Sequence, residues 1–152
     1  MPKVRQHAVS LGGTADEIES LFYEALKQGD VAMLMDCWAD EDEILCIHPG
    51  GARLVGHGQV RSAFEMMLSQ GPLRIRVEQL RRIEAMGSAV HSVLECVELP
   101  TPRGPMEVWV MATNVYHKTA RGWRLVAHHA SPGSPPEERS DGATATPSTF
   151  LH

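Results

Sequence analysis

One histidine stands where a side chain can reach a cavity. His48 follows a short apolar stretch and precedes Pro49 and two glycines, which end an extended segment because proline lacks a ladder donor and glycine admits positive φ. An imidazole at such a place can accept or release a proton near neutral pH. The competing interpretation is a histidine that only satisfies the turn.

A carboxylate interrupts an apolar strand pattern further along the chain. Glu95 has the parity of His91, Val93 and Val97, so it faces the same side of a strand as they do. A buried carboxylate costs several kcal/mol unless it is paired or hydrogen-bonded. If that side faces a cavity, Glu95 needs a partner such as His128. If it is the outer side, water solvates the carboxylate.

Two later strands carry further polar residues. Asn114 interrupts an apolar face, where its amide can donate to a ligand carbonyl or tie two strands together. His128 and His129 are neighbours, and adjacent residues of a strand point to opposite sides, so they cannot both line one pocket. Strict alternation groups His128 with Val126 and Ala130, and His129 with Trp123, Leu125 and Ser131.

Other chemistries find no support in the spacing. The histidines at 48, 57, 128 and 129 form no HxH or HxxxH pair, and the three cysteines form no CxxC pair. No serine lies in a GxSxG elbow, and no phosphate-binding loop is present. We therefore expect neither a metal ion nor a cofactor.

Helices come first among the elements that must position these residues. Thr14 and Glu17 form a capping-box pattern ahead of an apolar stripe with helical spacing. Gly29 ends that helix and Asp30 can cap a second one. The predicted helical pair covers about residues 14–40, and a third helix follows residues 56–58 and is broken at 71–72.

The second half of the chain changes to strand periodicity. From residue 73 the apolar period is 2 instead of 3.6. Short turns make neighbouring strands antiparallel, and helices followed by consecutive strands indicate an α+β fold. The predicted strands are 44–48, one beginning at 73, and about 89–99, 106–118 and 123–131.

Composition narrows the class of protein. A chain of 152 residues suits one domain. The formal net charge is −5, with acids and bases mixed, so no basic stripe indicates nucleic acid or an anionic membrane as a partner. The first ten residues lack the apolar core of a signal peptide, and no apolar run approaches a membrane span. We expect a cytoplasmic protein.

Several segments together resemble the nuclear-transport-factor-2-like superfamily, and most of all its SnoaL-like subgroup, which includes polyketide cyclases. They are residues 22–30 (FYEALKQGD), 37–40 (CWAD), 46–51 (CIHPGG), 54–56 (LVG), 122–126 (GWRLV) and 129–131 (HAS). The resemblance implies a cone-shaped, curved antiparallel or mixed sheet closed by three helices around a pocket, a cystatin-like roll. It covers residues 14–133, with an arm at 1–13 and a flexible, Pro- and Ser-rich tail at 134–152.

The resemblance also tests particular reactions. In ketosteroid isomerases, a branch of the superfamily, the base is an aspartate before a proline, and that place holds His48. The branch's oxyanion tyrosine falls near Phe22, with Tyr23 one residue away, and its second donor falls at Asn114. None of the three is retained, so the resemblance disfavours a steroid-type isomerase.

A second branch is the association domain of calcium/calmodulin-dependent kinase, whose pocket carries arginines. Those places hold Glu95, Asn114 and Ala130 here, so the resemblance implies a less cationic pocket. Such proteins usually dimerise through the exposed sheet face. Trp109 and Met111, which are off the pocket parity, suit a homodimer interface.

Two functions remain open. The first is a cofactor-free isomerase, cyclase or lyase that acts on a small apolar carbonyl compound and uses His48 as acid or base. The second is a non-catalytic ligand-binding or oligomerisation domain. We expect catalytic roles for His48 and Asn114, and ligand contacts from Phe22, Tyr23, Trp38, Glu95, Val110, Ala112 and His128.

Overall fold

The computed structural model of the chain describes residues 12–136. The predicted arm at 1–13 and tail at 134–152 lie almost wholly outside these residues. Gly12 belongs to the folded part, because its carbonyl accepts from the backbone N–H of Trp123 at 2.8 Å.

Within the described residues, three helices form where the sequence predicts them. They are α2 (Ala15–Gln28), α3 (Val31–Asp36) and α4 (Gly56–Leu68). Thr14 caps α2 by accepting from Glu17 N, while Glu17 reaches back one residue further than predicted, to Gly13 N. Gly29 ends α2 at a φ of 70°, which an L side chain rarely adopts.

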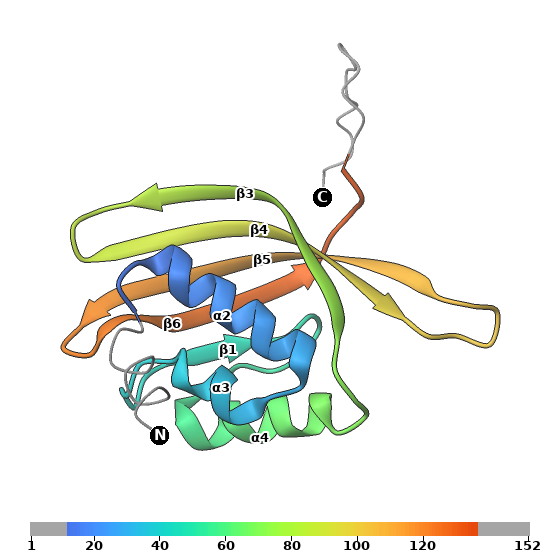
Figure 1. The fold of residues 1–152 in the computed structure, drawn as a ribbon, viewed down its shortest axis with the longest axis horizontal. Helices are drawn as coiled ribbons and strands as arrows, with labels where there is room; N and C mark the ends of the chain where they lie inside the picture. The colour runs from blue at the N-terminus through green and yellow to red at the C-terminus, as the bar shows by residue number, and fades with distance from the viewer. Residues whose placement is uncertain (1–11, 137–152) are drawn as a thin grey trace, which may run out of the picture.

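In the described part of the chain, the sheet has six strands in the order β2-β1-β6-β5-β4-β3. All neighbours are antiparallel except β1 and β6, which are parallel. The helices cover one face of this curved sheet, with α2 lying across it (Figure 1). The strands are β1 (Leu45–Ile47), β2 (Leu54–Val55), β3 (Arg74–Glu84), β4 (Ser88–Leu99), β5 (Met106–Thr119) and β6 (Gly122–Pro132). The fold is therefore α+β, as predicted; β2 is an addition to the prediction.

The core lies between the helices and the sheet. Phe22 of α2 packs edge-on against Tyr23, Trp38 and Phe64, and Trp38 is completely buried. Offset and edge-on aromatic pairs of this kind add about 0.5–1.5 kcal/mol beyond the area that they bury.

A β-bulge changes the alternation that the sequence predicts for β6. Val115 pairs with Ala127, but Tyr116 pairs with Leu125, so Val126 is an extra residue on β6. A bulge shifts the faces of the residues on either side of it. Leu125 and His128 are consequently both buried, and the prediction that Leu125 shares a face with the exposed His129 is wrong.

A second irregularity bends β3. The register with β4 shifts between Glu78 and Arg81, and Gln79 adopts a φ of 49°. In Figure 1 the strand turns sharply along its length. Its first half, with Ile75, reaches the cavity described below, and its second half brings Arg82 to the start of α2, where it pairs with Asp16.

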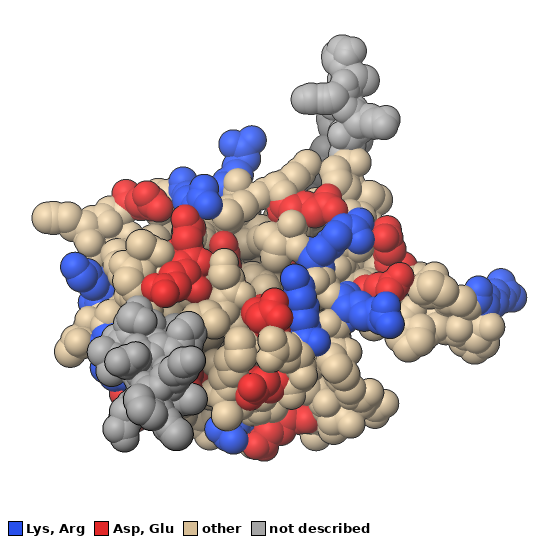
Figure 2. All heavy atoms as spheres, in the orientation of Figure 1, with Lys and Arg blue, Asp and Glu red and all other residues tan. Residues whose placement is uncertain are grey.

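Acidic and basic side chains are interspersed over the face drawn in Figure 2. Most ion pairs between described residues are exposed, such as Arg61–Glu65 on α4, and contribute little to stability. Among residues 12–136, no helix has the length and apolar character that crossing a membrane requires.

Candidate functional site

A cavity of about 230 Å³ opens between α2, α4 and the inner face of the sheet. Most of its wall is apolar, and three polar side chains of residues 12–136 reach it: His48, Glu95 and His128. A mostly apolar cavity with a few convergent polar groups is the usual form of a small-molecule site. The apolar lining is Phe22, Leu26, Pro49, Phe64, Met67, Leu73, Ile75, Val97, Leu99, Val108, Val110 and Ala130.

His48 follows β1 and stands at the cavity wall. Its ring packs edge-on against Phe64, with centroids 5.0 Å apart, and lies 6.2 Å from the ring of His128. Its Nε2 is 3.7 Å from Cys46 Sγ. Burial lowers the pKa of His48 below its ordinary value of 6.5, so the imidazole is neutral at pH 7 and able to accept a proton.

Glu95 faces the cavity, and its partner is Tyr23 of α2 instead of the expected His128. The Tyr23 hydroxyl donates to Glu95 Oε2 at 2.6 Å. Burial is the main cause that raises the pKa of Glu95 to about 7; the Tyr23 hydrogen bond lowers it, and Glu19 raises it. Near neutral pH this carboxyl group is therefore present in both its acid and its anionic form.

His128 is held from behind by Asn114. Its Nδ1 lies 2.6 Å from Asn114 Oδ1, which can only accept, so Nδ1 carries the proton. Burial, followed by the charges of His48 and His129, lowers the pKa of His128 to about 3. The ring is neutral, and its Nε2 has no hydrogen-bond partner among residues 12–136.

Asn114 itself is completely buried and does not line the cavity. Its Nδ2 donates to Tyr23 Oη at 3.0 Å and to Glu19 Oε2 at 3.4 Å. The amide thus joins His128 and Tyr23 into one chain that ends at Glu95. Asn114 supports two groups of the cavity wall from the second layer.

The predicted ligand-contact residues divide into two groups. Phe22, Glu95, Val110 and His128 line the cavity together with His48. Tyr23, Trp38 and Ala112 do not: Tyr23 lies behind Glu95, Trp38 belongs to the core and Ala112 packs beneath Val110 and Ala130.

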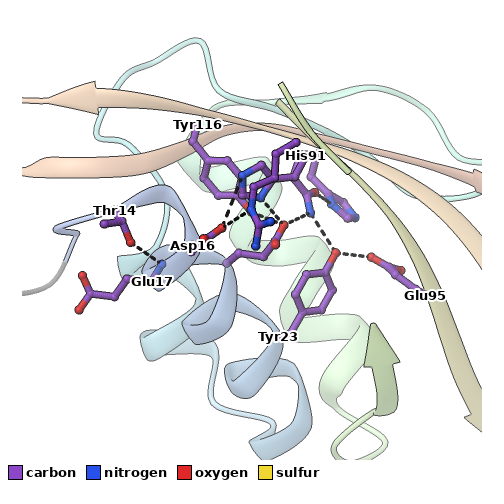
Figure 3. Close-up of polar contacts among 11 residues, drawn as sticks. Thr14, Asp16, Glu17, Tyr23, His91, Glu95 and Tyr116 are labelled. Carbon is purple, nitrogen blue, oxygen red and sulfur yellow. Dashed lines mark hydrogen bonds and ion pairs between the residues drawn. The ribbon is translucent and has the colours of Figure 1, made fainter. Parts of the chain in front are cut away.

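Behind the cavity lies a buried polar cluster that the sequence analysis missed (Figure 3). Tyr116 Oη donates to Glu19 Oε2 at 2.9 Å. His91 Nδ1 lies 3.0 Å from the same oxygen and its Nε2 lies 3.8 Å from Asp16 Oδ1, distances short enough for ion pairing but without hydrogen-bond geometry. The missed signal is helical spacing, since Glu19 stands three, four and seven residues before Phe22, Tyr23 and Leu26.

Asp16, Glu19 and His91 offer ligand atoms within 4.8 Å of one another. The guanidinium of Arg82 already pairs with Asp16 at 2.9 Å, and the Tyr116 and Asn114 side chains already donate to Glu19. A cation would have to compete with these donors, so the cluster fits a network of ion pairs and hydrogen bonds better than a metal centre.

The chain belongs to the SnoaL-like domain family, whose model matches residues 17–135. Its superfamily is that of the NTF2-like proteins, and its fold is the cystatin-like fold of their solved structures. None of the curated proteins matches this chain.

Solved structures give the likeness more detail. One from Thiobacillus denitrificans, provisionally named a calcium/calmodulin-dependent protein kinase type II association domain, is 32% identical over 82% of this chain and 98% of its own, with a TM-score of 0.74. One from Streptomyces avermitilis, provisionally named a dehydratase of the NTF2-like family, is 25% identical over 88% and 99%, with a TM-score of 0.70. The CaMKII hub of S. rosetta shares the fold, at 20% identity over 77% and 92% and a TM-score of 0.62.

Proposed function

We propose that the cavity binds a small, mostly apolar carbonyl compound and transfers a proton within it, as a cofactor-free isomerase, cyclase or lyase. The observation that carries the proposal is the convergence of His48, Glu95 and His128 on one otherwise apolar cavity. Burying these polar groups costs free energy on folding. Hydrogen bonds from them to a ligand explain why they lie on the cavity wall.

The cavity offers a base for the proton and a hydrogen-bond donor for the carbonyl oxygen. Neutral His48 removes a proton from the carbon next to the carbonyl, and the C–H electron pair forms a carbon–carbon double bond. The carbonyl π electrons move to oxygen, which the protonated form of Glu95 stabilises by donating a hydrogen bond. In a substrate with a carbon–carbon double bond at the β,γ position, this enolate is conjugated with that bond. The electrons on oxygen then re-form the carbonyl, the double bond moves to the α,β position and the γ carbon takes the proton back from His48, which completes an isomerisation. Tyr23 and Asn114 hold Glu95 and His128 in place from behind.

The test begins with the ligand. Mass spectrometry of small molecules that co-purify with the chain identifies candidates for turnover. On a substrate found in this way, His48→Ala is expected to lower kcat by at least about 100-fold, while His117→Ala, an exposed histidine of β5, leaves it unchanged. Equal rates for His48→Ala and the unaltered protein contradict the proposal.

A second candidate is a non-catalytic association domain that forms a homodimer through the outer face of the sheet. The 32%-identical structure supports it, as do exposed apolar side chains on β3 and β5, with Ile83 72% and Met111 41% exposed. Trp109, two residues before Met111 on β5, lies under Arg76, 5.7 Å from the guanidinium carbon to the ring centre. Exposed apolar patches of this kind mark interfaces.

Light scattering after size exclusion tests this interface. The unaltered chain is expected to have the mass of a dimer, and Met111→Lys that of a monomer. Met66→Lys, on the exposed side of α4, is the matched control and should remain dimeric. A dimer in both variants excludes the outer face.

A further inference from the structure

Glu19 is a buried carboxylate that does not line the cavity, yet it is connected to both polar ends of the wall. It is 6% exposed. Its Oε2 accepts hydrogen bonds from the Tyr116 hydroxyl and the Asn114 amide. Unlike a hydroxyl, an imidazole or an amide, a carboxylate can only accept hydrogen bonds. Each group that is hydrogen-bonded to Glu19 must therefore be the donor in that bond.

The first group to be oriented is the Asn114 amide. An amide can be turned over, which exchanges its donor and acceptor atoms. With Nδ2 toward Glu19 the contact is a hydrogen bond of 3.4 Å. The reverse orientation would place two acceptors against each other inside the protein, where an unsatisfied polar group is most costly. Glu19 thus holds Nδ2 on its own side and Oδ1 on the side of His128.

That orientation decides where two protons lie, the ring proton of His128 and the hydroxyl proton of Tyr23. Because Asn114 presents Oδ1 to His128, the imidazole must hold its proton on Nδ1, and Nε2 keeps its lone pair. Because Asn114 also donates to Tyr23 Oη, the tyrosine proton turns toward Glu95 Oε2. One carboxylate outside the cavity in this way orients two branches of hydrogen bonds that end on the cavity wall.

We propose that Glu19 is a positioning residue that fixes His128 as a hydrogen-bond acceptor, and that the ligand carries a hydroxyl or N–H group for His128 Nε2. The second clause rests on the proposed function. In the proposed function, Glu95 donates a hydrogen bond to a carbonyl oxygen of the ligand. The two requirements together specify a small apolar molecule with both a carbonyl oxygen and a hydroxyl or N–H group. A ligand with only ether or ketone oxygens would place an acceptor against the lone pair of Nε2.

The tautomer of His128 is directly measurable. In the full chain labelled with ¹⁵N-histidine at pH 7, long-range ¹H–¹⁵N spectra distinguish the Nδ1–H and Nε2–H forms, and His128→Gln assigns the signals. We expect His128 to be neutral and protonated at Nδ1. A predominant Nε2–H form overturns the proposal, and this outcome needs no variant that must fold.

Glu19→Gln tests the role of the carboxylate, because an amide donates as well as accepts and both directions of the chain become available. The Nε2–H form of His128 is expected to rise about tenfold or more. Glu24→Gln changes an exposed glutamate of the same helix whose one hydrogen-bond partner among the described residues is Gln28, and it should leave the tautomer unchanged. An unchanged tautomer in Glu19→Gln as well overturns the role of Glu19.

Two probes test the ligand clause. 2-Naphthol carries the hydroxyl that the acceptor requires, and 2-methoxynaphthalene has the same rings without it. Titrations followed on the His128 signals should give about tenfold tighter binding for 2-naphthol, and Glu19→Gln should reduce this preference. If the two probes bind equally well, the proposal that the ligand donates a hydrogen bond to His128 Nε2 is overturned, whereas the proposal that the cavity binds a small apolar molecule is kept. Failure of both to bind overturns the clause and counts against the proposed function, whereas the tautomer result still decides the role of Glu19.

Discussion

Removing the hydroxyl of Tyr23 tests its hydrogen bond to Glu95. In Tyr23→Phe a single oxygen is lost, and with it the hydrogen bond of 2.6 Å to Glu95 Oε2 and the hydrogen bond of 3.0 Å from Asn114 Nδ2. A hydrogen bond to an ionised group contributes about 1.5–3 kcal/mol, and 1.36 kcal/mol corresponds to one pKa unit. The pKa of Glu95, about 7 with tyrosine present, should therefore rise by about one to two units.

The same shift changes how stability depends on pH. Burial raises the pKa of folded Glu95 above its ordinary 4.5, so the folded state retains a proton that the unfolded state has lost. The free energy of unfolding therefore falls as pH rises from about 4.5 to about 7, and is insensitive to Glu95 above that. In Tyr23→Phe the fall should continue to about pH 8–9, for an additional loss of about 1.5–3 kcal/mol.

Two measurements check this prediction. Carboxyl ¹³C NMR gives the pKa of Glu95, and urea unfolding at pH 5, 7 and 9 gives the stability difference between variant and parent. Tyr116→Phe is the matched control, because that hydroxyl bonds Glu19 instead of Glu95, and it should leave the pKa of Glu95 near 7. A Glu95 pKa that is unchanged or lowered in Tyr23→Phe refutes the assignment of the hydrogen bond.

Three further outcomes follow from the same contacts. With a substrate in hand, kcat/KM should fall on the acid side, at a pH below the ordinary histidine pKa of 6.5, as His48 is protonated, and above about pH 7 as Glu95 ionises; a rate that still rises at pH 9 contradicts these roles. His128→Phe leaves Asn114 Oδ1 without its donor, so urea unfolding should show a loss of about 1–3 kcal/mol, and an unchanged midpoint would be inconsistent with the bond. Trp38→Ala empties a fully buried position and should cost about 3–5 kcal/mol, measured in the same way; a loss below about 1 kcal/mol would indicate that the core collapses around the gap.

Local physics made most elements predictable from the order of residues. The helix ends at Thr14, Gly29 and Asp30 follow from side chains and backbone angles within four residues of each cap. The grouping of Glu95 with His91 and Val93 follows from the period of an extended chain. These three residues and Asn114 are buried in the structure, whereas the period alone left open which face of the strand with Glu95 is covered.

The alternation was unreliable where a neighbouring strand intervenes. The extra residue at Val126 exists because β5 and β6 change register there, and a register is a property of two strands. The pattern of β6 alone contains no sign of it, so the buried position of Leu125 beside His128 could not be predicted. The parallel pairing of β1 with β6, which places His48 near His128, has the same origin.

For the polar groups of the cavity, the sequence predicts some properties and only the tertiary structure decides the others. That Glu95 shares a face with His91 and Val93 follows from its strand alone, and so does its need for a partner if that face is buried. That the partner is Tyr23, 72 positions away, and that Glu19 orients Asn114, 95 positions away, depends on how α2 crosses the sheet. Hydrogen bonds require distances within a few tenths of an ångström, and only the packing of helix on sheet brings such distant atoms to that separation.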